Sequence, residues 1–183
     1  MIEKTIKGIK YCLDEENLTA EVIQKKGCEG DIIIPETVVL KKVAYRVTSI
    51  AESAFEDCSS LTSIVIPDGV TSIGVAAFSD CSSLTSMVVA EGNTVYDSRE
   101  QCNAIIHTAT NTLISGCQNT IIPESVTSIG EAAFMGCDSL KSITFNGTKM
   151  QWNSIELGDE WNCEIPAQRV RCTDGNVKIE ECW

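Results

Sequence analysis

The fold of this chain is decided by the segment Val70–Gly92, VTSIGVAAFSDCSSLTSMVVAEG, because the chain contains two further copies of it. The copies at 47–69 and 126–148 have the same length of 23 residues. The copy at 47–69 shares 15 positions with the quoted segment, and ten positions are identical in all three copies. A fixed period of about 20–29 residues is typical of a solenoid, in which each repeat forms one coil and neighbouring coils bury each other's apolar side chains.

The strand of one coil can be read from the first copy. Its apolar residues Leu61, Ile64 and Ile66 are predicted to lie on this strand and to point into the core. Ser63 and Val65 alternate with them, so we expect these two side chains to face outward. Each coil therefore contributes a short outward surface to the stack.

Each copy also places a phenylalanine three residues before a cysteine, a spacing that predicts one turn of helix with both side chains facing the core. The recurring residues form two predicted ladders, Phe55, Phe78 and Phe134, and Cys58, Cys81 and Cys137. Side chains stacked in register run parallel rather than toward one another, which disfavours a disulfide. We interpret these cysteines as buried free thiols that pack as small apolar side chains. The alternative interpretation is a redox or metal site.

A longer, degenerate coil lies between the second and third copies, at 93–125. Its apolar stretches predict a hairpin with a two-residue turn at either 109–110 or 110–111. The first turn would place Cys102 opposite Cys117, whereas the second would separate them. Both arrangements are open from the sequence.

A solenoid needs caps over its open apolar ends. Alternating residues in 9–13 and 18–22 predict a hairpin cap with Leu13 opposite Leu18. A second hairpin around Lys41-Lys42 is predicted to project as an arm. At the other end, a short helix that begins after Thr148 as N-cap is predicted to seal the last coil. Its large apolar residues are Met150, Trp152, Ile155 and Trp161.

Together these segments predict one domain over 1–183. The cap hairpin and lead-in occupy 1–31, the repeat coils 32–148 and the C-terminal cap 149–183. The expected fold class is a β-rich leucine-rich-repeat solenoid of about five stacked coils, with short strands and short helical turns.

The motif V-T-S-I-G-x-A-A-F-x-x-C-x-S-L-x-S-I resembles the BspA-like leucine-rich repeat proteins of host-associated bacteria. The lead-in 32–38, the coil segment 96–106 and the tail 147–175 are similar to other coils of that family. The resemblance implies the solenoid fold. It also implies an exported or surface protein that binds host matrix or other cells.

Composition and single residues argue against several other functions. The chain has 14 lysines and arginines against 26 aspartates and glutamates, a formal net charge of −12, which argues against nucleic-acid binding. No run of about 18 apolar residues predicts a membrane span, and residues 1–7 lack the apolar region of a signal peptide. His107 is the single histidine, and no catalytic constellation, cofactor site or metal site is predicted around it.

We therefore expect a non-enzymatic module, a monomer, that binds a host-matrix or cell-surface protein or a glycan. The candidate binding surface consists of the outward strand residues Ser63, Val65, Ser86, Val88, Ser142 and Thr144. One alternative is a structural spacer within a larger surface protein. A less favoured alternative is a carbohydrate-active solenoid enzyme, which needs carboxylates that these outward positions lack. The expected location is extracellular or the cell surface, with a cytoplasmic location left open.

Overall fold

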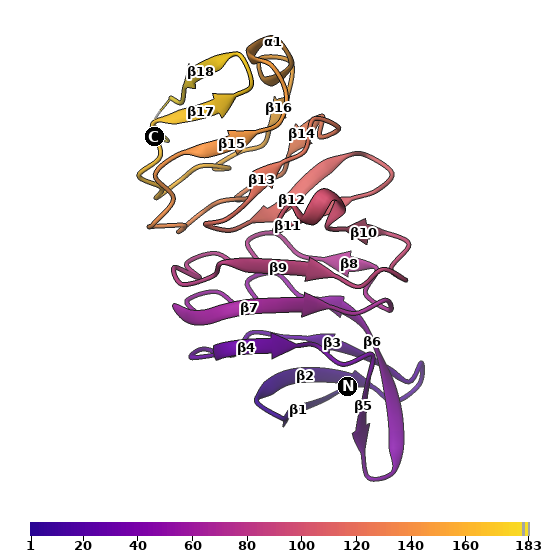
Figure 1. Ribbon diagram of the computed structural model, residues 1–183. Coiled ribbons are helices and arrows are strands. Elements are labelled where there is room, and N and C mark those ends of the chain that lie inside the picture. Colours follow the sequence, from indigo (N-terminus) through magenta and orange to yellow (C-terminus); the bar gives the residue numbers. More distant parts are fainter. Residues whose placement is uncertain (181, 183) are drawn as a thin grey trace.

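The computed structural model describes residues 1–180 and 182 and shows a β-rich solenoid of about six turns with almost no helix (Figure 1). The expected solenoid class is confirmed, but about five coils is too few. The additional coil is the segment 19–34. Its two strands pair in parallel with those of the first repeat copy, so it is stacked like any other coil.

Two sheets form the front of the stack (Figure 1). The first contains the parallel strands β4 (Glu29–Ile33), β7 (Ser60–Ile66) and β9 (Ser86–Val89). The second contains β13 (Ile121–Ile122), β15 (Ile143–Phe145), β17 (Arg169–Cys172) and β18 (Gly175–Lys178). As the sequence predicts, Leu61, Ile64 and Ile66 of β7 are fully buried. We call the outer surface of these two sheets the front face.

A second side of the stack carries the strands that begin most coils. In the N-terminal half they are β3 (Thr19–Val22), β6 (Val43–Ile50) and β8 (Ser72–Ile73). In the C-terminal half they are β12 (Thr112–Gly116), β14 (Ser128–Ile129) and β16 (Glu156–Leu157). Each set is parallel, and β6, β8 and β14 contain the Ser-Ile of the V-T-S-I start of a repeat copy.

On the third side, the predicted helical turn is wrong. Six-residue turns stand there instead, at 52–57, 75–80 and 131–136. Two residues of each turn have a positive φ, namely Ser53, Asp57, Ala76, Asp80, Ala132 and Gly136. The Phe55 N–H donates to the carbonyl of Ala77 in the next coil at 2.8 Å. Because such amides bond between coils, the i→i−4 bonds of a helix do not form. We call this side the turn side.

The predicted phenylalanine ladder is regular only between its first two members. Phe55 and Phe78 stack with ring centroids 5.4 Å apart and an angle of 7° between the planes. Phe134 instead packs edge-on against Trp161, with centroids 6.3 Å apart. The degenerate coil breaks the repetition between these two pairs, so the aromatic ladder has two parts.

The three repeat cysteines are buried and free, and burial raises the pKa of Cys58 to about 11 and that of Cys137 to about 12. The Cys81 thiol donates to the carbonyl of Phe55 at 3.2 Å. Cys28 is a further member, because its thiol and that of Cys58 share the Lys25 carbonyl as acceptor at 3.5 Å. The sequence comparison misses Cys28 because its coil lies outside the three copies.

The N-terminal cap consists of β1 (Ile2–Ile6), β2 (Ile9–Asp14) and β3, each antiparallel to the next. The predicted hairpin is present, but Leu13 pairs with Ala20 rather than with Leu18. Asp14 Oδ1 accepts two backbone N–H groups of the turn, at 2.8 and 3.2 Å, and Leu18 has a φ of 55°. This four-residue turn shifts the register by two and leaves Leu18 47% exposed.

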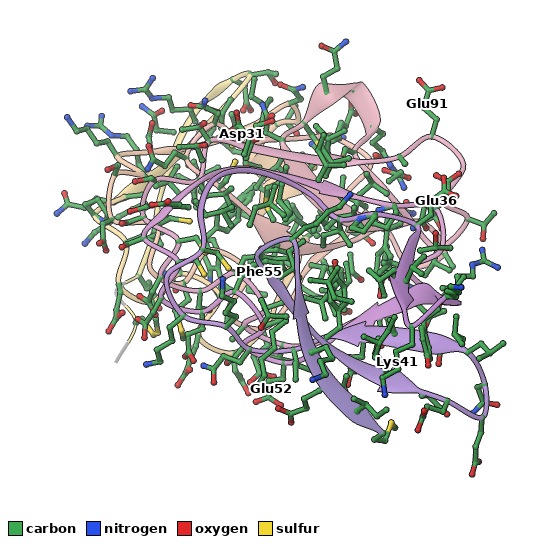
Figure 2. The ribbon with its side chains drawn as sticks, turned by 90° about the horizontal axis from the view of Figure 1, so that it is seen from below. Asp31, Glu36, Lys41, Glu52, Phe55 and Glu91 are labelled. Atoms are coloured by element: carbon green, nitrogen blue, oxygen red, sulfur yellow. A yellow bond between two sulfur atoms is a disulfide. The ribbon has the colours of Figure 1, made fainter. Side chains whose placement is uncertain are left out.

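The second hairpin, β5 (Thr37–Leu40) with β6, projects from the stack as expected (Figure 1). Lys41 and Lys42 form its turn, with φ values of 50° and 69°. In Figure 2, which views the N-terminal end, Lys41 lies out on this arm and Phe55 near the middle of the stack. Val39 on the arm is 59% exposed, whereas Val38 and Tyr45 are buried.

The degenerate coil contains β10 (Tyr96–Asp97), the 3-10 turn η1 (Arg99–Gln101) and the hairpin of β11 (Ala104–His107) with β12. Next to its turn the hairpin has the register that would oppose Cys102 and Cys117, but an irregularity between Ile105 and Ile106 shifts the pairing by one residue before it reaches Cys102. Both cysteines are buried and free, in separate parts of the core. The opposed arrangement is therefore wrong.

The C-terminal cap begins with the one-turn helix α1 (Lys149–Trp152), and Thr148 is its N-cap as predicted. Trp152 and Trp161 are buried, but Met150 is 80% exposed and takes no part in sealing the last coil. Glu181 and Trp183 of the predicted cap lie outside the described residues.

A disulfide, Cys163–Cys182, also closes this end, with a Cα–Cα distance of 5.1 Å. The sequence does not predict it. These two cysteines stand outside the repeat register, so no comparison between copies indicates that they meet.

Gly136 shows where the stack tolerates no side chain. It occupies the position of Asp57 and Asp80 in the other copies, and a Cβ built on it would lie 2.5 Å from the backbone N and Cα of Asp80. We expect Gly136→Ala to lower the free energy of unfolding by about 1–3 kcal/mol through this overlap, in addition to the backbone strain at its φ of 69°.

The matched control for this variant is Gly27→Ala. Gly27 has a similar φ, 75° against 69°, but a Cβ there has no atom within 4 Å. It therefore tests backbone strain alone, about 1 kcal/mol. Equal losses in urea unfolding of the two variants would contradict the argument from overlap.

The buried cysteine ladder makes a second prediction, on thiol reactivity. Cys58, Cys81 and Cys137 have little contact with solvent and raised pKa values, so few thiolates exist at pH 8. We expect a thiol reagent to label them slowly in the native protein and quickly in denaturant, with mass spectrometry identifying each site. Half-exposed Cys12 and Cys172 serve as internal controls that label in the native state. Rapid native labelling of all three ladder thiols would contradict their burial.

Candidate functional site

The front face of the first sheet carries two rows of side chains in register. Strand pairing aligns Asp31 with Ser63 and Ser63 with Ser86, and it aligns Ile33 with Val65 and Val65 with Val88. We call these the polar row (Asp31, Ser63 and Ser86) and the apolar row (Ile33, Val65 and Val88). Parallel strands lie about 4.8 Å apart, so each row is a close-set line of side chains across three coils.

The polar row is held by hydrogen bonds to one carboxylate. Asp31 Oδ1 accepts from the Ser63 hydroxyl at 2.6 Å and from the Thr62 hydroxyl at 2.8 Å. These two bonds lower the pKa of Asp31, so the row carries a fixed negative charge at neutral pH. Figure 2 places Asp31 toward the front rim of the N-terminal end.

The apolar row is open to solvent. Ile33 is 72% exposed and Val88 is 43% exposed, while Val65 between them is half-buried. A β-branched side chain has little rotamer freedom to lose, so contact with this row costs a partner little entropy. The two rows together form a flat amphipathic surface.

The six candidate residues do not form one continuous surface. Ser63, Val65, Ser86 and Val88 lie together in the first front sheet, whereas Thr144 belongs to the second and Ser142 directly precedes its strand β15. The degenerate coil intervenes, because the Val89 N–H donates to the Ser98 hydroxyl and the Ile121 N–H donates to the Cys102 carbonyl. In the second sheet, Thr144 pairs with Ile121 on one side and with Arg171 on the other.

Asp31 and Ile33 are members of the rows that the sequence reasoning missed. The signal for them is the recurrence of an apolar triplet before proline, Ile32–Pro35 and Ile64–Pro67. Aligning these two segments places Ile33 at the position of Val65.

The turn side carries a line of carboxylates, which we call the acidic column: Asp57, Asp80 and Glu164. Partial burial raises the pKa of Asp80, and the charges of Glu164 and Asp57 raise it further. Lys26 continues the line at the N-terminal end, with its Nζ 3.2 Å from Asp57 Oδ2. The turn side is therefore mostly negative and ends in a positive charge.

Three further features bear on catalysis, metal binding and membrane insertion. His107 is half-buried, with its Nδ1 3.1 Å from the Thr110 hydroxyl and its ring edge-on to Tyr96. Within residues 1–180 and 182, no three His, Cys, Asp or Glu side chains are grouped to hold a metal ion. None of the helices in that range has the length and apolar character needed to cross a membrane.

Comparison with known families decides what kind of solenoid this is. The BspA type leucine rich repeat region matches the chain in six copies, over residues 36–115 and 105–156. The chain belongs to this family. The resemblance drawn from the repeat motif is thereby confirmed.

The BspA-type chain is also similar to solved structures of bacterial leucine-rich repeat proteins. One from Bacteroides ovatus is 28% identical, with a TM-score of 0.57 over 91% of this chain and 40% of its own length. One from Bacteroides capillosus is 23% identical, with a TM-score of 0.50 over 93% of this chain and 97% of its own length. The chain thus spans less than half of the Bacteroides ovatus protein. No curated protein is similar enough to count as a match.

The acidic column generates a prediction on pH dependence. The folded state raises the pKa of Asp80, so its carboxylate destabilises the fold at neutral pH, and this effect disappears as the pH falls through the raised pKa toward the ordinary value of about 3.9. We expect Asp80→Asn to raise the melting temperature by about 1–3 °C at pH 7 and to leave it nearly unchanged at pH 3.

Glu91→Gln is the control for removing one negative charge, because Glu91 is exposed on a loop. It should leave the melting temperature almost unchanged at both pH values. A lower melting temperature for Asp80→Asn at pH 7 would contradict the repulsion argument.

Proposed function

We propose that this BspA-type chain is a non-enzymatic binding module whose polar and apolar rows contact a protein or glycan partner. The observation that carries the proposal is the register of the two rows across β4, β7 and β9. It lines up exposed apolar side chains beside hydroxyls and one fixed carboxylate. Such a surface offers van der Waals contact and hydrogen bonds together, as partner-binding surfaces do.

Rigidity supports this proposal. The rows stand on strands whose main chains are bonded to each other, and Asp31 is fixed by two hydroxyl groups. A surface ordered before binding loses little conformational entropy when a partner docks. The residues of the rows are small and lack a proton-transfer group other than Asp31, which favours recognition over catalysis.

We further propose that the protein acts outside the cell, at its surface or secreted. The Cys163–Cys182 disulfide supports this location, because disulfides persist mainly in oxidising compartments. Host-matrix proteins, cell-surface proteins and glycans are the partners available there. A structural spacer is the competing function, and it predicts no partner for the rows.

Binding to immobilised extracellular-matrix proteins and mucin glycans tests the proposal. We expect Val88→Asp, which places a charge in the apolar row, to weaken binding about tenfold or more, equal to about 1.4 kcal/mol. Val39→Asp is the matched control, because Val39 is also an exposed strand valine but lies on the arm. This control should bind like the unchanged protein.

Three results would count against the proposal. Absence of binding to any probe would favour the spacer. Equal weakening by Val88→Asp and Val39→Asp would move the contact away from the rows. Turnover of a glycan, abolished by one substitution in this chain, would replace the binding module with an enzyme.

A further inference from the structure

The front sheets end in a free strand edge at each end of the stack. Among the described residues, β4 pairs only with β7, and β18 pairs only with β17. The Ile34 N–H donates to Val65 O at 3.1 Å, so the neighbouring Ile33 directs its own N–H and C=O away from β7, toward the free edge. A hollow of about 420 Å³ lies beside this edge, between Ile33 and the turn at Lys7 and Gly8. Free edges with space beside them accept a further strand.

The two ends of the front face carry opposite charges. At the N-terminal end, the exposed strand residues Glu29 and Asp31 of β4 are acidic, and Lys7 and Lys25 line the same hollow from the cap and the loop before β4. At the C-terminal end, exposed Arg169 is paired with exposed Lys178, and Arg171 is exposed two residues further along β17. Val170 between the two arginines is fully buried, so both arginines face outward with Thr144 and Lys178.

The turn side shows the reverse polarity. Its N-terminal end carries Lys26, whose side chain is 73% exposed even though it contacts Asp57. Its C-terminal end carries exposed Glu160 and Glu164, and Glu164 belongs to the acidic column. The outward residues of the terminal front strands are therefore acidic on β4 and basic on β17 and β18, and the terminal residues of the turn side have the opposite signs.

We propose that a second copy of this chain stacks head to tail on the first, with β18 of one copy beside the free edge of β4 of the other. In this arrangement Lys178 and Arg169 of one copy face Glu29 and Asp31 of the next. On the turn side, Glu164 faces Lys26 in the same contact. In this head-to-tail contact, residues of opposite charge meet both in front and on the turn side. A contact between two N-terminal ends or two C-terminal ends would instead place residues of like charge together.

The contact is heterologous, because it joins different surfaces of the two copies. Each added copy presents a new free edge, so the assembly continues as an open row rather than closing as a dimer. Two short strand edges and a few exposed ion pairs form a small interface. The association is therefore weak in dilute solution and grows with concentration, which reconciles it with the monomer expected from the sequence.

Sedimentation of the unchanged protein over a wide concentration range tests the proposal first. In low salt, the weight-average mass is expected to rise continuously with concentration, beyond that of a dimer. Addition of about 1 M NaCl should reduce the association, because the Debye length falls to about 3 Å. A single monomeric mass at every concentration would overturn the proposal.

Charge-swapped variants then test the orientation. Glu29→Lys places two lysines, at positions 29 and 178, on the two sides of the contact, and Lys178→Glu places two glutamates there, so each variant alone should associate about tenfold more weakly. An equimolar mixture restores opposite charges at every contact, and its association should recover. Matched controls are Glu91→Lys and Lys141→Glu, which make the same charge changes at exposed positions away from both ends. They should associate like the unchanged protein.

Circular dichroism and melting curves establish that the variants fold. Failure of the mixture to recover, or equal losses in the control variants, would overturn the head-to-tail contact. Neither Glu29 nor Lys178 belongs to the polar or apolar row, so this result is independent of the partner-binding experiment.

Discussion

The structure depends on one constraint: a single coil of this chain cannot bury its own apolar side chains or pair its own strands. Leu61, Ile64 and Ile66 become fully buried only because further coils are stacked above and below them. The same stacking satisfies the backbone of the front strands, since β4, β7 and β9 each pair with the strand of the neighbouring coil. Burial and hydrogen bonding therefore both act along the axis of the stack.

This constraint explains the places where the repeat changes. The third copy has Gly136 where the other two have aspartate, because this residue packs directly against the backbone of Asp80 and leaves no room for a side chain. The turn side forms turns rather than a helix because its amides serve the neighbouring coil. The ends of the stack, which lack a neighbour on one side, use other devices: an antiparallel meander at one end, and buried tryptophans with a disulfide at the other.

The surface follows from the same geometry. Residues at the same position of successive coils form a line of side chains along one side of the stack. A residue that differs in one coil therefore lies at a defined place along this line. Asp31 at one end of the front and Arg171 at the other are such differences, and they give the stack its electrical polarity. The polar and apolar rows are placed by strand register and face outward together, which links the binding surface to the packing of the core.

The sequence by itself determined the solenoid class, the inward and outward residues of the repeat strands, the arm and the N-cap at Thr148, because each depends on local periodicity or turn chemistry. It did not determine what depends on contacts between coils. The pairing of Leu13 with Ala20 rests on a turn that Asp14 closes, and the separation of Cys102 from Cys117 rests on a bulge. The membership of Asp31 and Ile33 in the rows required the register of β4 on β7, which only the stacked structure supplies, since strand pairing between coils brings together residues about 30 positions apart.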